Sequence, residues 1–294
     1  MKSRARFLVA LSILVLMGSA HAWGWMAHRL INAAALEVLP ADMKAAIGSH
    51  GDVLVRHAAD PDHWKSNPLE RHRHYIDLEM GDRAGYPYTA LPRMHAEARR
   101  VLGDKKLADM GILPWWIETY TDSTIQSMRD PNARTWIRMA ALSHYVADGH
   151  MPLHTTVNYD GQLTGNRSIH FRFEWWMLEQ NRSAIHLTPH ELLKVGDPLN
   201  DAWTFILRSH TAVDTILAAD TRIREELGPP WRGFHKGDTS WRIPNPVYDQ
   251  RLWEETGELA QRKMSLAAEA VAGYWYHAWV KAGKPDLRAV PDPD

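Results

Sequence analysis

The stretch Met139-Ala-Ala-Leu-Ser-His-Tyr-Val-Ala-Asp-Gly-His-Met-Pro-Leu-His154 decides how the rest of the chain is interpreted. In a helix, His144 and Asp148 are four residues apart and share one face. Pro152 cannot continue this helix because it has no N–H, so the chain turns and His154 can return towards Asp148. Two imidazoles and a carboxylate arranged in this way suit a metal ion with nitrogen and oxygen ligands. The alternative is a hydrogen-bonded core histidine and a helix-end charge.

Two further groups of ligand-type residues lie on either side of this stretch. His170 and Glu174 have the spacing of one helical face, and they follow the first group after only a loop. The other group contains several possible metal ligands, and their spacing does not show which of them would bind: Asp60, Asp62, His72 and His74. The alternatives are a structural pair for the first group and a solvated charged loop for the second.

Residues 1–22 are predicted to be a secretory signal peptide. Three basic residues precede a short apolar run, and a small-residue cleavage pattern ends at Ala22. The apolar run is too short for a membrane span; the alternative is a signal anchor that stays attached. Cleavage would make Trp23 the new N-terminus, whose amine and carbonyl can chelate one metal in a five-membered ring, with His28 five residues further on. The alternative for Trp23 is a plain hydrophobic anchor.

The composition excludes some functions and favours others. The 294 residues include no Cys, so neither a disulfide nor a thiolate metal site can form, whereas 17 His are present. Without the leader, 31 Lys and Arg face 35 Asp and Glu, a balance of −4 that gives no general case for binding duplex nucleic acid. Residues 264–280 come nearest to a membrane span, but Glu269 and His277 interrupt them. We expect export to the periplasm or the medium; the oligomeric state is not determined by the sequence.

The hydrophobic pattern predicts an all-α fold, a single mainly helical domain over residues 23–294 with long loops on one side. Helical patterns cover 26–47 with a break at Pro40, 53–59 stopped by Pro61, 94–102, 114–128, 133–149, 169–181, 200–227 and 247–282. Residues 74–78 are expected to form a brief strand or an extended connection. Residues 81–92, 155–166 and 233–246 are expected to be loops.

Taken together, these motifs resemble a known superfamily. They are Trp-Gly-x-x-x-His from Trp23, His-Tyr-Ile-Asp from His74, His-x3-Asp-x5-His from His144 and His-x3-Glu from His170. Their order and spacing are similar to those of the zinc-dependent phospholipases C and the single-strand nucleases of the nuclease P-one and S-one type. The resemblance spans residues 23–174. It implies a mainly helical fold with long loops around a trinuclear zinc site.

The resemblance also implies a ligand set, carried over residue by residue. The first zinc would take Asp62, His74, His144 and Asp148. The second would take His154, His170 and Glu174. The third would take the Trp23 amine and carbonyl, His28 and Asp148, which then bridges two ions. Asp62 is preferred to Asp60 because Asp62-His-Trp-Lys fits the family pattern better.

The implied chemistry is phosphate-ester hydrolysis. Clustered zinc ions neutralise the phosphodiester and lower the pKa of water to about 7. Asp62 would orient or deprotonate the attacking water, and Lys65 and Asn166 are candidates for binding substrate. For Lys65 the alternative is a solvated side chain.

Three functions remain open. Glu174 and the stretch Tyr159-Asp-Gly-Gln-Leu-Thr164 are similar to the phospholipases, which favours hydrolysis of phospholipid head groups. The short Trp23-to-His28 spacing and the His-Tyr-Ile-Asp motif are nuclease-like, so a single-strand nuclease or 3′-nucleotidase is the alternative. A non-catalytic metal-binding protein is a second alternative, against which the complete ligand set argues.

Overall fold

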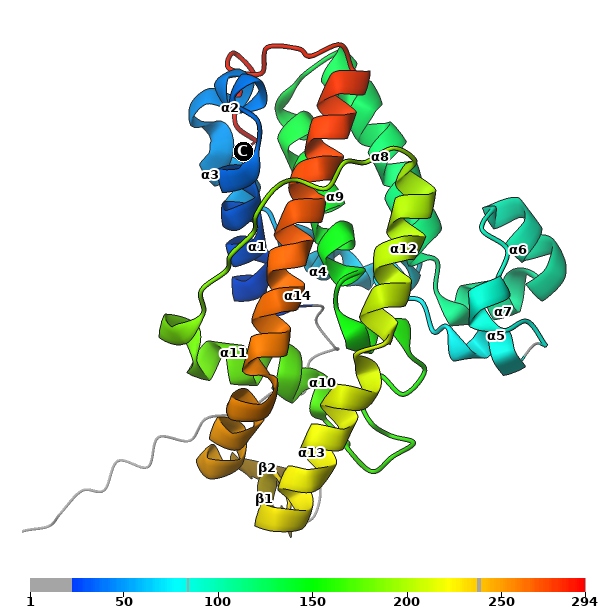
Figure 1. The fold of residues 1–294 in the computed structure, drawn as a ribbon, viewed down its shortest axis with the longest axis vertical. Coiled ribbons are helices and arrows are strands. Elements are labelled where there is room, and N and C mark those ends of the chain that lie inside the picture. The colour runs from blue at the N-terminus through cyan, green and yellow to red at the C-terminus, as the bar shows by residue number, and fades with distance from the viewer. Residues whose placement is uncertain (1–22, 84, 237–238, 294) are drawn as a thin grey trace, which may run out of the picture.

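The structure, a computed structural model, describes residues 23–83, 85–236 and 239–293. The predicted signal peptide, residues 1–22, lies outside the described residues. The chain is built around α9 (Ala133–Asp148), which packs against α1 (Trp25–Val38), α3 (Gly51–Arg56), α8 (Leu113–Arg129) and α14 (Pro246–Lys281) (Figure 1). The predicted all-α class is confirmed.

The bounds of α9 follow from its sequence. Asn132 caps the N-terminus by accepting a hydrogen bond from the Arg134 backbone N–H at 3.1 Å, and its own N–H donates to Thr135 Oγ1 at 3.1 Å. Residues 139–156 are all buried, as expected of a helix surrounded by others. Pro152 ends the regular helix and opens a single 3₁₀ turn, Pro152–Thr155.

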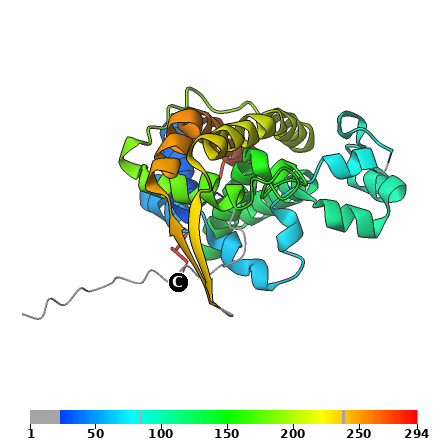
Figure 2. The ribbon, with the colours of Figure 1, turned by 90° about the horizontal axis from the view of Figure 1, so that it is seen from below.

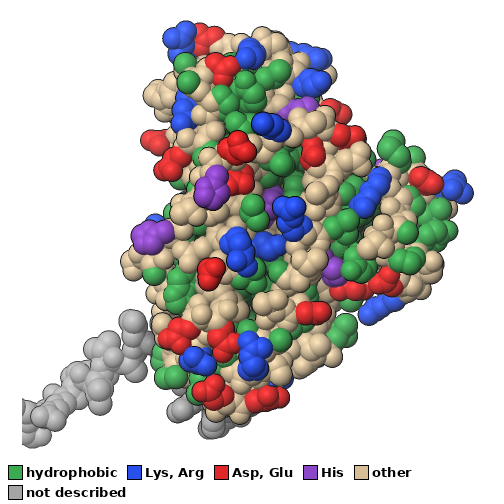
Figure 3. Space-filling model, viewed as in Figure 1, with side chains coloured by type: hydrophobic (Ala, Val, Ile, Leu, Met, Phe, Trp, Pro, Cys, Tyr) green, Lys and Arg blue, Asp and Glu red, His purple; other side chains and the backbone are tan. Residues whose placement is uncertain are grey.

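The remaining helices complete the bundle and its edges. They are α2 (Ala41–Ile47), α4 (Asp60–His63), α5 (Glu79–Arg83), α6 (His95–Leu102), α7 (Asp104–Met110), α10 (Ile169–Phe171), α11 (Met177–Gln180), α12 (Pro198–His210) and α13 (Val213–Leu227). A π-helical segment, Arg172–Trp176, joins α10 to α11. In the part of the chain that is described, no helix is both long and apolar enough to span a bilayer. On the face shown in Figure 3, acidic and basic side chains are intermixed, in keeping with the net charge of −1.

Residues 79–83 and 85–110 form a side lobe that projects from the bundle and carries α5, α6 and α7 (Figures 1 and 2). Backbone hydrogen bonds tie its base to the segment before it: Asp77 N–H donates to Met110 O at 2.7 Å, and Ile112 N–H donates to His72 O at 2.7 Å. Gly111 has φ +88°, and a Cβ there would lie 2.2 Å from the Tyr75 carbonyl oxygen. Only glycine fits this close approach.

Several expectations for local structure were wrong. Residues 81–92 are not all loop, because they include the end of α5 and a 3₁₀ turn, Tyr88–Ala90. Residues 233–246 are not a loop, because an antiparallel hairpin, β1 (Trp231–Lys236) and β2 (Thr239–Pro244), extends away from the helices (Figure 2). Its aromatic and β-branched residues favour strands, although Gly and Pro at its ends suggested a loop. Pro61 does not stop a helix but lies in the first turn of α4, where a missing N–H costs nothing. The segment predicted as one helix over 200–227 is split between α12 and α13.

Candidate metal centre

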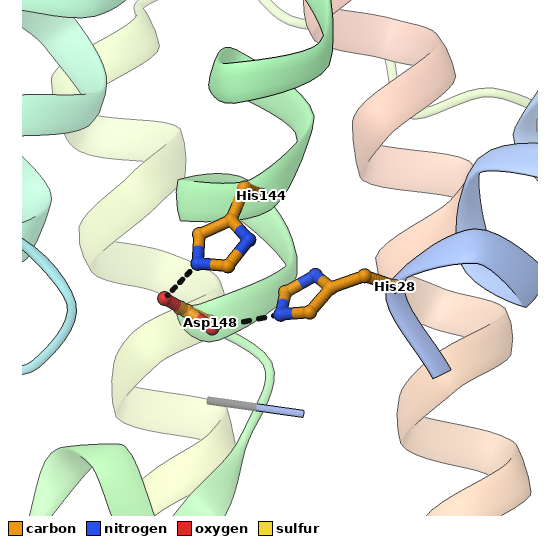
Figure 4. A group of neighbouring side chains, drawn as sticks. All are labelled: His28, His144 and Asp148. Atoms are coloured by element: carbon orange, nitrogen blue, oxygen red, sulfur yellow. Dashed lines mark ion pairs between the residues drawn. The ribbon is translucent and has the colours of Figure 1, made fainter. Parts of the chain in front are cut away.

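Asp148, the last residue of α9, is fully buried and lies at the centre of the candidate site. His144, one helical turn earlier, places Nε2 3.3 Å from Asp148 Oδ2. His28 reaches the other carboxylate oxygen from α1, with Nε2 3.5 Å from Oδ1 (Figure 4). The two imidazole rings stack with their centroids 3.9 Å apart. One carboxylate is therefore shared by imidazoles from two helices.

A second set of side chains, from α4 and the segment after it, lies on the His144 side of this carboxylate. His74 Nδ1 lies 2.9 Å from Asp148 Oδ2 and 3.1 Å from His144 Nε2, and His144 Nε2 lies 3.7 Å from Asp62 Oδ1. The His144 Nδ1–H donates to the Ala58 carbonyl at 3.0 Å, which leaves Nε2 as the acceptor that faces the cluster.

The structure separates the two aspartates between which spacing could not choose. Asp62 is buried beside His74 and His144. Asp60 instead places Oδ2 2.7 Å from His57 Nδ1, outside the cluster. The preference for Asp62 as a candidate ligand thus agrees with the geometry.

The third set contains His154, His170 and Glu174. His154 follows the turn at Pro152, and its Nδ1 lies 3.6 Å from Asp148 Oδ1. Glu174 Oε2 lies 2.9 Å from His170 Nε2 and 3.6 Å from His154 Nε2. The segment 74–78 forms a connection and not a strand, and its Ile76 N–H donates to the His154 carbonyl at 2.9 Å.

Trp23 is fully buried against two of these sets. Its indole N–H donates to the Ala147 carbonyl at 3.1 Å, one residue before Asp148. The next residue, Gly24, donates its N–H to the Glu174 carbonyl at 3.2 Å. The described part of the chain thus begins beside the cluster, whereas chelation by the Trp23 amine and carbonyl stays a prediction.

The donor atoms fit divalent metal ions. Among the described residues, three groups each bring together one possible ligand atom per residue, and within each group these atoms lie within 4.8 Å of one another. The groups are His28, His144 and Asp148; Asp62, His74 and His144; and His154, His170 and Glu174. Several of these buried atoms have no hydrogen-bond partner, among them His28 Nε2, Asp148 Oδ1, His154 Nδ1 and Glu174 Oε2. Buried polar atoms without a partner are costly. A set of imidazole nitrogens and carboxylate oxygens is the donor set that zinc accepts.

Electrostatics lower the pKa values of two carboxylates of the cluster, Asp148 and Glu174. Burial opposes the charge of Asp148, but His144 and His154 beside it hold its pKa well below the usual range. Burial likewise opposes the charge of Glu174, whose pKa is nevertheless lowered by His170. Burial lowers the pKa of His28 well below its ordinary value, so its imidazole is neutral. Ionised carboxylates and neutral imidazole are the states that bind metal.

The family can now be assigned from sequence comparison. Residues 27–222 match the family described as Zinc dependent phospholipase C. This chain belongs to that family. Comparison with curated proteins gives no match. The resemblance drawn from the motifs is therefore confirmed, and the family supports a zinc-dependent hydrolase of phosphoric esters. Every candidate ligand except Trp23 lies inside the matched residues.

Glu70 is a buried carboxylate of this zinc-dependent phospholipase C family member that the sequence interpretation missed. Its Oε1 accepts a hydrogen bond from the Tyr145 hydroxyl and lies 3.4 Å from His74 Nε2, while Arg73 donates to Oε2. Burial opposes its charge, but hydrogen bonds from His74, Tyr145 and Arg73 lower its pKa to about 2. A carboxylate behind a ligand histidine fixes the ring orientation and raises its basicity. The four-residue spacing from Glu70 to His74 was the available signal.

Replacing Glu70 with Gln is expected to weaken metal binding about 10- to 100-fold, the usual cost of losing a carboxylate behind a metal ligand. Competition of the purified protein with a chromogenic zinc chelator measures this affinity. Glu258→Gln is the matched control, because its side chain is 94% exposed on α14. Equal affinities for the two variants would contradict the role assigned to Glu70.

The same variant is expected to change the pH dependence of stability. A carboxyl whose pKa falls from 4.5 to about 2 on folding contributes stability that is fully present above about pH 4.5 and is lost as the pH falls towards 2. Glu70→Gln removes this contribution, so unfolding in urea should depend less steeply on pH in that window.

The π-helical segment that carries Glu174 is held by a buried ion pair. Arg172 is 1% exposed and donates through Nη1 to Asp220 of α13. Asp220 also accepts from the Tyr248 hydroxyl at 2.6 Å and from Asn166 Nδ2 at 2.9 Å. His170 and Glu174 were expected on one regular helix, but Glu174 lies in the π-helical segment. The two side chains still approach each other across this wider turn. π turns of this kind are common at functional sites.

Replacing Arg172 with Met is expected to lower the free energy of unfolding by about 3 kcal/mol, because Asp220 would remain buried without its cation. Urea denaturation of the wild type and the variant measures the change. Arg222→Met is the control, since Arg222 pairs with Glu255 at the surface and should contribute less than about 1 kcal/mol. A loss no larger than that of the control would show that the buried pair contributes little.

The two candidate substrate contacts differ in their surroundings. Lys65 Nζ donates to Asp62 Oδ1 at 2.6 Å, so this cation lies at the edge of the cluster. Asn166 is buried, and its amide nitrogen donates to three acceptors of α13, including the Leu217 carbonyl at 3.1 Å. These bonds anchor the loop before α10, and contact between Asn166 and substrate stays a prediction without support from this geometry.

Proposed function

We propose that this chain is an exported zinc phosphodiesterase that acts on phospholipid head groups in the manner of a phospholipase C. The observation that carries the proposal is the convergence of three buried groups of His, Asp and Glu on Asp148, in a chain of the zinc-dependent phospholipase C family. The structure supports a site for more than one ion, because Asp148 Oδ1 and Oδ2 face different imidazoles.

The proposed ligand sets are those that the motifs imply. One ion would be held by Asp62, His74, His144 and Asp148, a second by His154, His170 and Glu174, and a third by Trp23, His28 and Asp148. Zinc bound there would neutralise the phosphodiester charge and lower the pKa of water. The described geometry supports this sharing, since Asp148 contacts His28 at 3.5 Å and His144 at 3.3 Å.

Asp62 is the proposed catalytic residue. Its Oδ1 accepts a hydrogen bond from Lys65 and lies near His144, whereas its Oδ2 is buried without a hydrogen-bond partner. Oδ2 is therefore the oxygen left to orient the attacking water and accept its proton. Lys65 fixes the carboxylate in this position and supplies a positive charge at the edge of the site.

Export and domain organisation belong to the same proposal. Residues 1–22 would be removed as a signal peptide, and residues 23–294 would form the mature domain. Burial of Trp23 beside Ala147 and Glu174 supports a mature chain that begins at the cluster. The protein would then act in the periplasm or the medium.

The test uses the mature protein from Trp23, with its zinc content measured by mass spectrometry. One preparation is assayed on mixed phospholipid vesicles and on denatured DNA. We expect about three zinc ions per chain and release of phosphorylated head groups from lipid. Hydrolysis of DNA with untouched lipid would instead support the single-strand nuclease. A protein with its full zinc content that cleaves neither substrate would support a non-catalytic metal-binding role.

A further inference from the structure

A cleft of about 460 Å³ opens beside the metal centre. It is lined by Lys65, Ser66, Pro68, Arg71, His72 and Tyr75. Its volume lies within the range of small-molecule sites. Lys65 connects it to the cluster, because this lysine lines the cleft and also donates to Asp62. A group that continues from a phosphodiester held at the cluster would therefore enter this cleft.

The lining is positively charged. It contains Lys65 and Arg71 and no carboxylate. Two acidic residues next to it are already paired: Asp62 with Lys65, and Glu70 with Arg73. Among the described residues, Arg71 forms no ion pair, so its guanidinium is the cation left to meet an anion. Guanidinium groups bind phosphate through two parallel hydrogen bonds.

The wall of the cleft is held in place by backbone and side-chain contacts. His72 Nδ1 and the Tyr75 hydroxyl are 3.2 Å apart. The His72 carbonyl accepts from Ile112 N–H at 2.7 Å, and the Tyr75 carbonyl accepts from Leu113 N–H at 3.3 Å. The polar groups of this wall are thus fixed before any ligand arrives, which reduces the entropic cost of binding.

We propose that this cleft binds a second phosphate of the substrate, next to the phosphodiester at the metal centre. The inference rests on the proposed function and narrows its substrate class. A head group that ends in a quaternary ammonium would place a cation against Lys65 and Arg71, which opposes binding. A phosphorylated inositol head group and the neighbouring phosphate of an oligonucleotide both supply the required anion.

The experiment compares pairs of substrates that differ by one phosphate. The zinc-loaded mature protein is assayed on phosphatidylinositol and phosphatidylinositol 4-phosphate in the same detergent micelles, and on the dinucleotides TpT and pTpT. We expect about a tenfold higher kcat/KM for the member with the additional phosphate, in whichever pair is hydrolysed. The pair that shows the preference identifies lipid or nucleotide as the source of the phosphate.

Variants at Arg71 attribute the preference to the cleft. Arg71→Ala should reduce the ratio of the two kcat/KM values about fivefold, and Arg71→Glu should reverse it. Arg134→Ala is the matched control, because Arg134 is exposed at the opposite end of α9 from Asp148 and should leave the ratio unchanged. Equal ratios in wild type and both Arg71 variants would overturn the proposal.

A binding measurement separates failure of this proposal from failure of the proposed function. Calorimetric titration with inositol 1-phosphate and inositol 1,4-bisphosphate needs no turnover. Tighter binding of the bisphosphate that is lost in Arg71→Glu supports the cleft even if no phosphodiester is cleaved. Equal binding of the two inositol phosphates by the wild type, together with no preference for the additional phosphate in either substrate pair, rejects the cleft.

Discussion

Asp148→Asn is expected to remove about two metal ions per chain and to lower kcat/KM by more than about 100-fold. The loss should exceed the 10- to 100-fold effect of groups that only support a ligand. The amide keeps the size of the side chain but removes the charge that His28, His144, His74 and His154 all approach within 3.6 Å. Metal content by mass spectrometry and rates on the preferred substrate give the two numbers.

Two further carboxylates provide controls for this variant. Glu174→Gln should mainly weaken the binding of one ion, because its carboxylate lies next to His154 and His170 and, among the described residues, forms no ion pair with another member of the cluster. Asp60→Asn should retain all metal, since Asp60 pairs with His57 outside the cluster. Equal metal loss from Asp148→Asn and Glu174→Gln would exclude a bridging role for Asp148.

Adding one alanine before Trp23 is expected to remove one metal ion per chain and lower activity at least about 100-fold. The extension converts the free amine into an amide, which cannot chelate together with the carbonyl of the same residue. Trp23 itself should stay in place, because its buried indole is bonded to Ala147 and the following N–H is bonded to Glu174. Metal analysis of the extended and the mature protein measures the loss.

Trp23→Phe distinguishes chelation from packing. This variant keeps the amine and carbonyl but loses the indole hydrogen bond to Ala147. It should retain its metal and lose about 1 kcal/mol of stability. If the extended protein kept its full metal content and activity, the third ion would not depend on the N-terminus.

The local parts of the site could be predicted from sequence because each lies on one element. His144 and Asp148 share a face of α9, and Pro152 turns the chain so that His154 approaches Asp148. The helical periodicity likewise gave the central helices. These inferences need only spacing and the known geometry of a helix.

The contributions that depend on long-range packing could not be predicted. Glu70 is held by Tyr145, 75 positions away. Residue spacing left Asp60 and Asp62 open, and only the family resemblance preferred Asp62, which lies beside His74 and His144. His150 lies close to the candidate ligands in sequence, yet its Nδ1–H donates to the Val146 carbonyl and its ring stacks on Phe205. Sequence spacing does not distinguish such a core histidine from a ligand.

The attachment of the side lobe has a consequence for how substrate choice can diverge among related proteins. The chain leaves and re-enters the bundle through adjacent backbone, at the hydrogen bonds Asp77–Met110 and Ile112–His72. Lengthening such an excursion costs little, about 0.6 kcal/mol for each doubling. Insertions or deletions within the lobe are therefore expected to leave the position of α9 unchanged. Tyr75 and His72 sit at its base and also line the cleft, so a change in the lobe that shifted this base would alter one wall of the cleft.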